Sequence, residues 1–172
     1  MPEPPKLYRK IYQGSGVSLS GEALIDLLLA VHEKGADFRF RATGLSMYPT
    51  IRDGDIITLS PLKGLHPVST DIVAFRHPDT GKLVVHRIIG ISSESFEASG
   101  DNSEESDGQI PLSNILGLVT QLERNGYAIF WPDSRKFPFL ARIYFKLYFT
   151  FIRLEKRIYA VCTKIIRYRK NK

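Results

Sequence analysis

The sequence predicts a mainly β fold: a sandwich-like or barrel-like body, one helix near the N-terminus and a long amphipathic helix at the C-terminus. In the middle of the chain, several short apolar runs alternate with turn residues, which is typical of all-β domains. Apolar residues recur at helical spacing before this region and again after it. With 172 residues, 43% of them hydrophobic, the chain can bury a sizeable core.

Residues 1–36 form a predicted N-terminal lead and helix. Residues 1–16 carry basic residues but no apolar core. Ser20 is suited to the helix N-cap, and Gly35 is suited to ending the helix. Between them, apolar residues follow at helical spacing: Ala23, Leu24, Leu27, Leu28 and Val31. We expect this helix to be a packing element.

Residues 37–134 form the predicted β domain. Phe38, Phe40 and Ala42 alternate with arginines, which indicates a half-buried strand. We expect further strands at 56–59, 71–75, 83–91, 95–98 and 115–122. The connections between them are a tight turn at 53–55, a loop at 60–70 and a hairpin turn at 77–81. Residues 123–136 are expected to be a junction.

Residues 135–172 form the predicted basic, aromatic C-terminal helix. Its apolar seam has spacings that alternate between four and three residues: Leu140, Tyr144, Leu147, Phe151, Leu154, Ile158, Val161 and Ile165. Three hypotheses follow. Residues 137–170 lie on an anionic membrane surface, or the seam packs on the body or on another chain, or the basic charge binds nucleic acid. Aromatic residues beside the seam favour the membrane, so we expect no nucleic acid partner.

The charge of the chain is divided unevenly. Residues 135–172 carry a net charge of +11, whereas residues 1–134 carry −5. The single cysteine, Cys162, excludes an intramolecular disulfide framework and a cysteine-based zinc site. The sequence shows neither a secretory signal peptide nor an apolar run near the ~20 residues of a membrane span. We therefore expect a protein that is cytoplasmic or peripheral to the cytoplasmic membrane.

Ser46 lies in a turn that contains both glycine and proline. Gly44 permits backbone geometry that brings a substrate close to the chain, and Pro49 fixes the exit of the turn. Backbone N–H groups here, that of Ser46 included, are candidates for an oxyanion hole. A lone serine in such a turn is usually only a turn residue. We take Gly44, Met47 and Pro49 as candidate substrate-binding or oxyanion-hole residues.

His86 is the candidate base for this serine. It shares a strand face with the apolar Val84 and Ile88, where a polar side chain needs a partner such as a carboxylate. The acidic loop 100–108 contains two aspartates, Asp101 and Asp107. Taken singly, such a histidine is usually structural and such a loop is usually solvated. Serine, histidine and aspartate together are a nucleophile, a base and an orienting carboxylate.

Taken in order, these segments resemble the type I signal peptidases. Residues 44–50 (Gly-Leu-Ser-Met-Tyr-Pro-Thr) are similar to the serine box of that family, and residues 71–73 resemble the strand that follows it. Residues 85–90 are similar to the box with the general base, and residues 100–102 to the last box. The resemblance covers roughly residues 38–120. It implies a signal-peptidase or SOS-repressor-type β-barrel-like fold, serine endopeptidase activity, no cofactor and no metal.

The resemblance also assigns roles within the site. The common bacterial enzymes have lysine at the base position, whereas the archaeal, endoplasmic-reticulum and sporulation-associated branch has histidine. In that branch two aspartates lie six residues apart, as Asp101 and Asp107 do. This implies that Asp107 orients His86 and that Asp101 is structural or supporting, although which aspartate completes the site stays open. Lys82 is a competing base, ranked lower because it lies four residues before His86.

The implied reaction is acyl transfer from an extended peptide or preprotein, laid along a strand edge, to Ser46. Family members prefer small side chains beside the cleaved bond. They usually carry a transmembrane anchor before the serine box, which is not seen here, and Ser69-Thr70-Asp71 replaces their usual Gly-Asp. The alternatives are a cytoplasmic substrate, self-cleavage, an unrecognised export route or a partner that supplies the anchor.

The second hypothesis for the function is a non-catalytic peptide-binding or membrane-associated adaptor on the same fold.

Overall fold

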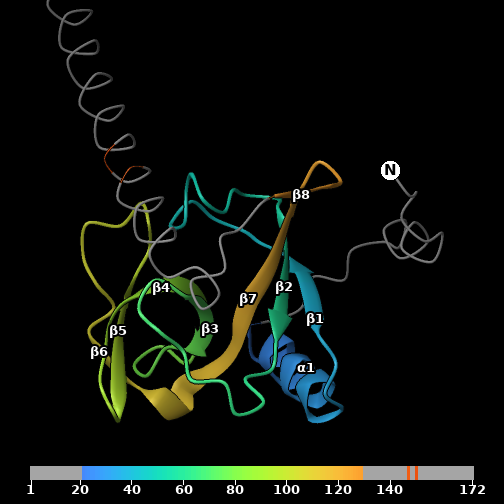
Figure 1. Ribbon diagram of the computed structural model, residues 1–172. Coiled ribbons are helices and arrows are strands. Elements are labelled where there is room, and N and C mark those ends of the chain that lie inside the picture. The colour runs from blue at the N-terminus through green and yellow to red at the C-terminus, as the bar shows by residue number, and fades with distance from the viewer. Residues whose placement is uncertain (1–20, 130–146, 148–149, 151–172) are drawn as a thin grey trace, which may run out of the picture.

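The computed structural model describes residues 21–129, together with Leu147 and Thr150. The elements follow in the order α1 (Gly21–Glu33), β1 (Phe38–Arg41), β2 (Ile56–Ser60), β3 (Ile72–Arg76), β4 (Leu83–Ile91), β5 (Ser95–Ser99), β6 (Gln109–Pro111), a 3₁₀ turn at Leu112–Asn114, β7 (Ile115–Arg124) and β8 (Tyr127–Ile129) (Figure 1). The predicted mainly β fold with an N-terminal helix is confirmed. The predicted C-terminal helix and the N-cap Ser20 lie outside the described residues.

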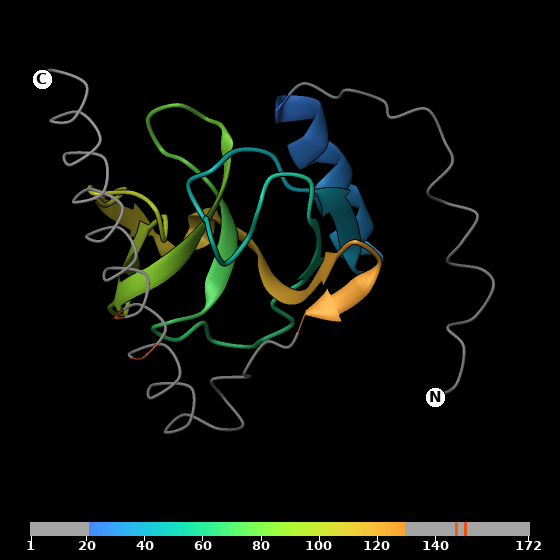
Figure 2. The same ribbon diagram turned by 90° about the horizontal axis from the view of Figure 1, so that it is seen from above.

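The strands form one antiparallel sheet with the order β1-β2-β7-β3-β4-β5-β6, and β8 pairs with β7. The sheet is open, so the expected barrel-like closure is wrong in that detail. The segments after β1 and before β6 are irregular loops, and no described strand joins β1 to β6. Figures 1 and 2 show β1, β2 and α1 at one side of the molecule and β5 and β6 at the other.

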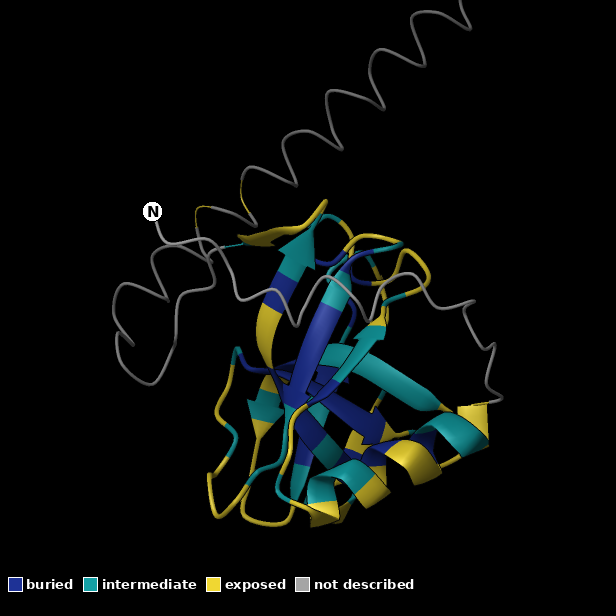
Figure 3. Cartoon of the chain, turned by 90° about the vertical axis from the view of Figure 1, so that its right-hand side faces the viewer, coloured by how far each residue is buried: buried dark blue, intermediate teal, exposed yellow. Residues whose placement is uncertain are grey.

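Strand β7 joins the two sides of the sheet. Its first residues pair with β3, from Ile115 to Leu118, and later residues pair with β2, as far as Glu123. Each of these ladders contains a register shift, and such irregularities bend a sheet. The bent sheet encloses two apolar clusters, one under α1, β1 and β2 and the other within β3–β6. The buried residues of Figure 3 accordingly concentrate in the strands.

Helix α1 packs its apolar face against the first cluster. Ile25 and Leu28 are fully buried, while Leu27 and Leu29 face outward. The helix ends before Gly35, which has a φ of +70° and donates its N–H to the carbonyl of His32 at 2.8 Å. A left-handed residue after the last turn is a common helix stop that favours glycine. The predicted stop at Gly35 is therefore confirmed.

Two strands were not predicted. Strand β6 is only three residues long, and the expected junction at 123–136 begins instead with the end of β7 and with β8. The hairpin between β7 and β8 turns at Asn125 and Gly126, which have φ values of 53° and 81°. Asn-Gly is a strong hairpin signal because both residues tolerate positive φ. The sequence therefore contained the signal for this hairpin.

Candidate active site

Ser46 lies on a loop of residues 43–53, here called the serine loop, which connects β1 to β2. Its base is closed by two backbone hydrogen bonds, from Ala42 N–H to the Asp55 carbonyl at 2.8 Å and from Gly54 N–H to the Ala42 carbonyl at 2.9 Å. Gly54 has a φ of +87°, which fits the predicted tight turn at 53–55. The loop therefore leaves the sheet and returns to it at one point.

Arg124 of β7 holds the base of the serine loop. Its guanidinium donates to both carboxylate oxygens of Asp55, at 2.9 and 2.7 Å, and to the Thr50 carbonyl at 3.1 Å. The Arg52 N–H donates to the same carboxylate at 2.7 Å. Burial alone would raise the pKa of Asp55, but these hydrogen bonds and the two arginine charges lower that pKa below its ordinary value. Asp55 is therefore a charged anchor.

The candidate residues of the serine loop differ in what they contribute. Gly44 has a φ of +96°, and its N–H donates to Asp53 at 2.9 Å, so this N–H is already engaged. Ser46 is exposed, whereas the side chain of Met47 is buried. Pro49 follows a cis peptide bond and is not among the residues that line the groove described below. Gly44 thus contributes its backbone conformation, and Met47 contributes an apolar wall.

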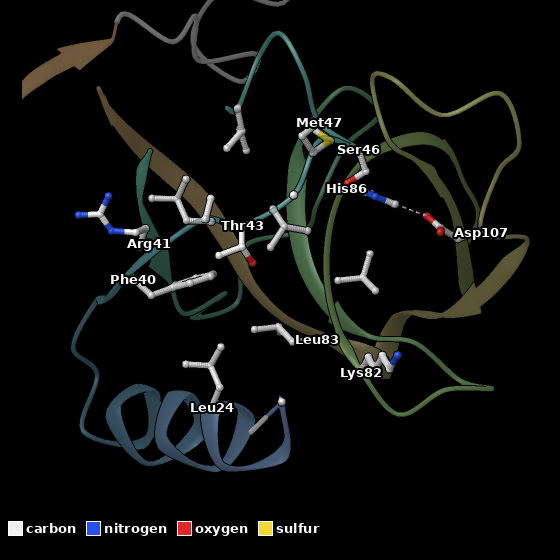
Figure 4. Close-up of a pocket in the computed structure, with 17 residues that line it drawn as sticks. Leu24, Phe40, Arg41, Thr43, Ser46, Met47, Lys82, Leu83, His86 and Asp107 are labelled. Carbon is white, nitrogen blue, oxygen red and sulfur yellow. Dashed lines mark hydrogen bonds and ion pairs between the residues drawn. The ribbon is translucent and has the colours of Figure 1, made fainter. Parts of the chain in front are cut away.

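His86 and Asp107 form a hydrogen-bonded pair. The imidazole Nδ1 lies 2.7 Å from Asp107 Oδ2, and the side chains are 12% and 16% exposed. The ring of His86 also meets the ring of Phe75 edge-on, with a centroid distance of 6.4 Å. A carboxylate on Nδ1 fixes the proton there and leaves Nε2 as the acceptor. Figure 4 shows the Ser46 side chain beside the imidazole, on the side away from Asp107.

The loop that follows β5 is fastened to the serine loop. The N–H of Asn102 donates to the Ser46 carbonyl at 2.7 Å, and its side-chain amide donates to the Leu45 carbonyl at 3.2 Å. Gly100 fits closely between the two catalytic candidates. A Cβ there would lie 2.6 Å from the Ser46 carbonyl oxygen and 3.0 Å from His86 Nε2. Gly100 thus lets the histidine and the serine loop approach each other.

Asp101 does not face His86. It forms a two-bond ion pair with Arg87, with distances of 2.8 Å from Nε and 2.8 Å from Nη2, and the two side chains are 2% and 4% exposed. Arg87 also donates to the carbonyl of Thr70 at 2.9 Å. Thr70, in place of the usual glycine of the resembling family, has a φ of +85°. Asp101 therefore ties the loop after β5 to β4.

Ser46, His86 and Asp107 lie together at one end of a groove of about 880 Å³. The wall is mostly apolar: Leu24 of α1, Phe40 and Ala42 from the β1 side, Met47, Ile51, Ile57, and residues Leu83–Val85 of β4. Two strand edges run along it. In the described part of the chain, β1 pairs only with β2, and residues 83–86 of β4 pair only with β3. Both edges therefore keep backbone groups available to an added strand.

Lys82, the competing base, also lines this groove but at its other end. Figure 4 shows it apart from Ser46, and a strand rises about 3.3 Å per residue, so four residues separate it from His86 by about 13 Å. The arrangement therefore favours His86 as the base.

Four residues that support the site were not predicted from the sequence: Arg87, Arg124, Gly100 and Asn102. Gly100 and Asn102 flank Asp101 in residues 100–102, which resemble the last box of the signal peptidases. This resemblance was the only feature of the sequence that pointed to them.

Comparison with known proteins gives one family. The model described as Peptidase S24-like matches residues 13–120, which include Ser46, His86, Asp101 and Asp107. This match agrees with the peptidase superfamily to which the sequence resemblance pointed. No curated protein matches the chain.

Proposed function

Because the chain belongs to the Peptidase S24-like family, we propose that it is a serine endopeptidase of the signal-peptidase type with a histidine base. One observation carries this proposal: the His86–Asp107 pair and Ser46 meet at one end of an apolar groove. An isolated structural histidine would not need an exposed serine beside it. The adaptor hypothesis does not account for this meeting of a nucleophile, a base and an orienting carboxylate.

The proposed reaction begins with proton transfer from the Ser46 hydroxyl to His86 Nε2. Ser46 Oγ attacks the carbonyl carbon of the peptide, and the tetrahedral oxyanion is stabilised by backbone N–H groups of the serine loop, with that of Ser46 as our first candidate. His86 then gives the proton to the leaving amine, which breaks the peptide bond. Water, activated by the same base, hydrolyses the acyl-enzyme and frees Ser46. Asp107 stabilises the imidazolium through Nδ1.

The proposed substrate is an extended peptide segment that lies between β1 and residues 83–86 of β4. Strand addition uses backbone hydrogen bonds for affinity and leaves side-chain pockets to provide specificity. Both strand edges flank the groove, and its apolar lining includes Met47 and Val85. An apolar lining favours uncharged side chains next to the cleaved bond, and the family resemblance implies that they are small.

The test is cleavage of a mixture of short, small-residue-rich peptides, followed by mass spectrometry. We expect the wild type to cleave, and Ser46→Ala and His86→Ala each to lose the activity. Ser93→Ala and His66→Ala are matched controls, because both residues are exposed and lie outside the groove. Equal cleavage by all variants would indicate a contaminating protease. Peptide binding without cleavage by the wild type would favour the adaptor.

Self-cleavage is a second candidate, favoured by one observation. Gly21, the first residue of α1, lines the groove, so the residues before it join the described chain at that groove. A segment attached there has a high effective concentration at the site. We expect cleavage of the intact chain to proceed at a rate independent of protein concentration and to be absent in Ser46→Ala. A rate proportional to concentration would contradict cleavage within one chain.

A further inference from the structure

Lys82 and His86 lie on the same face of one extended segment. The Lys82 carbonyl accepts a hydrogen bond from His77 N–H at 2.9 Å, so the β3–β4 ladder continues to this residue. Side chains alternate along a strand, and Lys82, Val84 and His86 therefore point to one side. The four-residue separation corresponds to about 13 Å. If an extended substrate lies along β4, one of its residues lies beside His86. The substrate residue four positions farther along then lies near Lys82.

Lys82 is the cation that the groove leaves for a ligand. Among the described residues that line the groove, the ionisable ones are Arg41, Lys82, His86 and Asp107. His86 and Asp107 are bonded to each other. The guanidinium of Arg41 donates to the Gly54 carbonyl at 3.2 Å and is therefore partly engaged. Lys82 is exposed, and its ammonium has no ion pair within the described residues.

The wall between the two ends of the groove is apolar. Val84 lies between Lys82 and His86 on their face of β4, and Leu83 and Val85 of the opposite face also line the groove. Among the described residues, no acidic side chain other than Asp107 lines it. A substrate strand that lies along β4 therefore meets the positive charge of Lys82 beyond an apolar stretch. A positive charge attracts a carboxylate, and next to a low-dielectric wall this attraction is less screened than in open solvent.

We propose that Lys82 is a specificity-determining residue, which favours substrates that carry an acidic side chain about four residues from the cleaved bond. This inference rests on the proposed peptidase function. The groove extends from Ser46 in one direction, so the acidic residue lies on one side of that bond only. Exposed ion pairs are weak, and we expect the preference for Glu over Gln at this position to be about two- to fivefold.

The test uses terminally blocked peptides built on one cleaved sequence, with Glu, Gln or Lys placed four residues before or four residues after the cleaved bond. Blocked ends ensure that the only variable carboxylate is the side chain. The wild type, Lys82→Glu and Lys82→Gln are compared by kcat/KM. Lys34→Glu is the matched control, because Lys34 is exposed and lies outside the groove but makes the same change in net charge.

We expect the wild type to prefer Glu over Lys on one side of the bond, Lys82→Gln to lose the preference, Lys82→Glu to reverse it and Lys34→Glu to retain it. Increasing the salt concentration should weaken the preference. If Lys82→Glu gives the same ratios of kcat/KM between the peptides as the wild type, the inference about Lys82 is wrong. The proposed peptidase function would not be affected by that result. Binding of the same peptides to Ser46→Ala, measured by fluorescence anisotropy, gives a second readout. A reversed binding preference without any turnover in the wild type would support Lys82 and overturn the peptidase.

Discussion

A hydrogen atom is the only side chain that residue 100 accommodates without displacing its neighbours. The Cβ of any other residue would lie 2.6 Å from the Ser46 carbonyl oxygen, 2.6 Å from Ser103 Oγ and 3.0 Å from His86 Nε2. The carbonyl belongs to the backbone of the serine loop and cannot rotate aside as a side chain would. Gly100 has no reactive group, yet its small size sets how closely the serine loop and His86 approach.

Gly100→Ala should therefore reduce activity far more than it reduces stability. A displacement of about 1 Å in a catalytic group can cost about 100-fold in rate, whereas overpacking typically costs about 1–3 kcal/mol of stability. We would measure kcat/KM and the thermal midpoint of both proteins. Gly90→Ala is the control, because its Cβ would meet its nearest neighbour at an ordinary 3.7 Å. Full activity in Gly100→Ala would contradict the proposed catalytic geometry.

Replacing each aspartate of the acidic loop by asparagine should have a different effect on activity and stability. Asp107→Asn removes the carboxylate from His86 Nδ1 and should lower kcat on the order of 10³–10⁴-fold, with little loss of stability. Asp101→Asn leaves Arg87 partly unpaired in a buried site and should cost about 3–5 kcal/mol of stability. Chemical denaturation and single-turnover kinetics separate the two effects. A stable, inactive Asp101→Asn would assign the orienting role to Asp101 instead.

Thr70 has backbone strain that glycine would relieve. Its φ of +85° is unfavourable for a β-branched residue, and such strain costs of order 1–3 kcal/mol. After the entropic cost of glycine in the unfolded chain is subtracted, Thr70→Gly should raise the free energy of unfolding by about 1 kcal/mol. The neighbouring Ser69→Gly, where φ is not positive, should lower it slightly. Urea denaturation of both variants tests the expectation, which fails if Thr70→Gly is the less stable.

The serine loop is positioned by contacts that lie far away in sequence. Arg124, 69 residues beyond Asp55, anchors one end of the loop, and the backbone and amide of Asn102 fasten its middle. The two distant anchors come from β7 and from the loop after β5. Loops that carry catalytic groups require such external support, because their own backbone makes few regular hydrogen bonds.

The Asp55 anchor should make the protein sensitive to acid. A carboxylate whose pKa is lower in the folded state stabilises the fold above its unfolded pKa of about 3.9, and this stability is lost as the pH falls through the folded value. Asp55→Asn should therefore lose stability at pH 7 and show a smaller further loss below about pH 4.

We would follow unfolding by circular dichroism from pH 7 to pH 2. Asp26→Asn, an exposed change on α1, should behave as the wild type. A parallel acid profile for Asp55→Asn and the wild type would contradict the role of this carboxylate.

Local patterns predicted most of the described elements and brought together the candidate site residues, but they did not predict the contacts that support the site. The alternation in β4 placed His86 on the face of Val84 and Ile88, and the structure packs both of these residues against the second cluster. The ion pairs of Arg87 and Arg124 join segments 14 and 69 residues apart, and no periodicity predicts such partners. The open sheet depends on how irregular loops run in space, which the strand pattern does not specify.

In the chain as a whole, the net positive charge and the candidate active site lie in different segments. The groove, the Ser46 site and both apolar clusters lie within residues 21–129. The net charge of +11 lies in residues 135–172, which are outside the described fold except for Leu147 and Thr150. Of the described residues, no helix is long and apolar enough to cross a membrane. From this basic and aromatic composition we infer that the segment attaches to an anionic surface.

The full chain should therefore bind vesicles that contain anionic lipid and not vesicles of neutral lipid. Each basic residue near such a surface contributes about 1 kcal/mol, and salt weakens this attraction. Co-sedimentation at two salt concentrations measures the effect. Replacing Arg153, Lys156 and Arg157 by Gln should weaken binding, whereas replacing the same number of basic residues in 21–129 should not. Equal binding to neutral vesicles would contradict an electrostatic attachment.

The two free strand edges beside the groove also bear on solubility. An exposed edge is a template for pairing between copies of a chain, and proteins often oppose such aggregation with charged residues on the edge. β1 carries Arg39 and Arg41, of which Arg41 is exposed and Arg39 is ion-paired to Glu123. Arg41 therefore places a positive charge at each β1 edge, so two copies repel where these edges would meet. A single extended peptide brings no such sheet with it, and the edges can remain open to a substrate without joining the molecules into fibres.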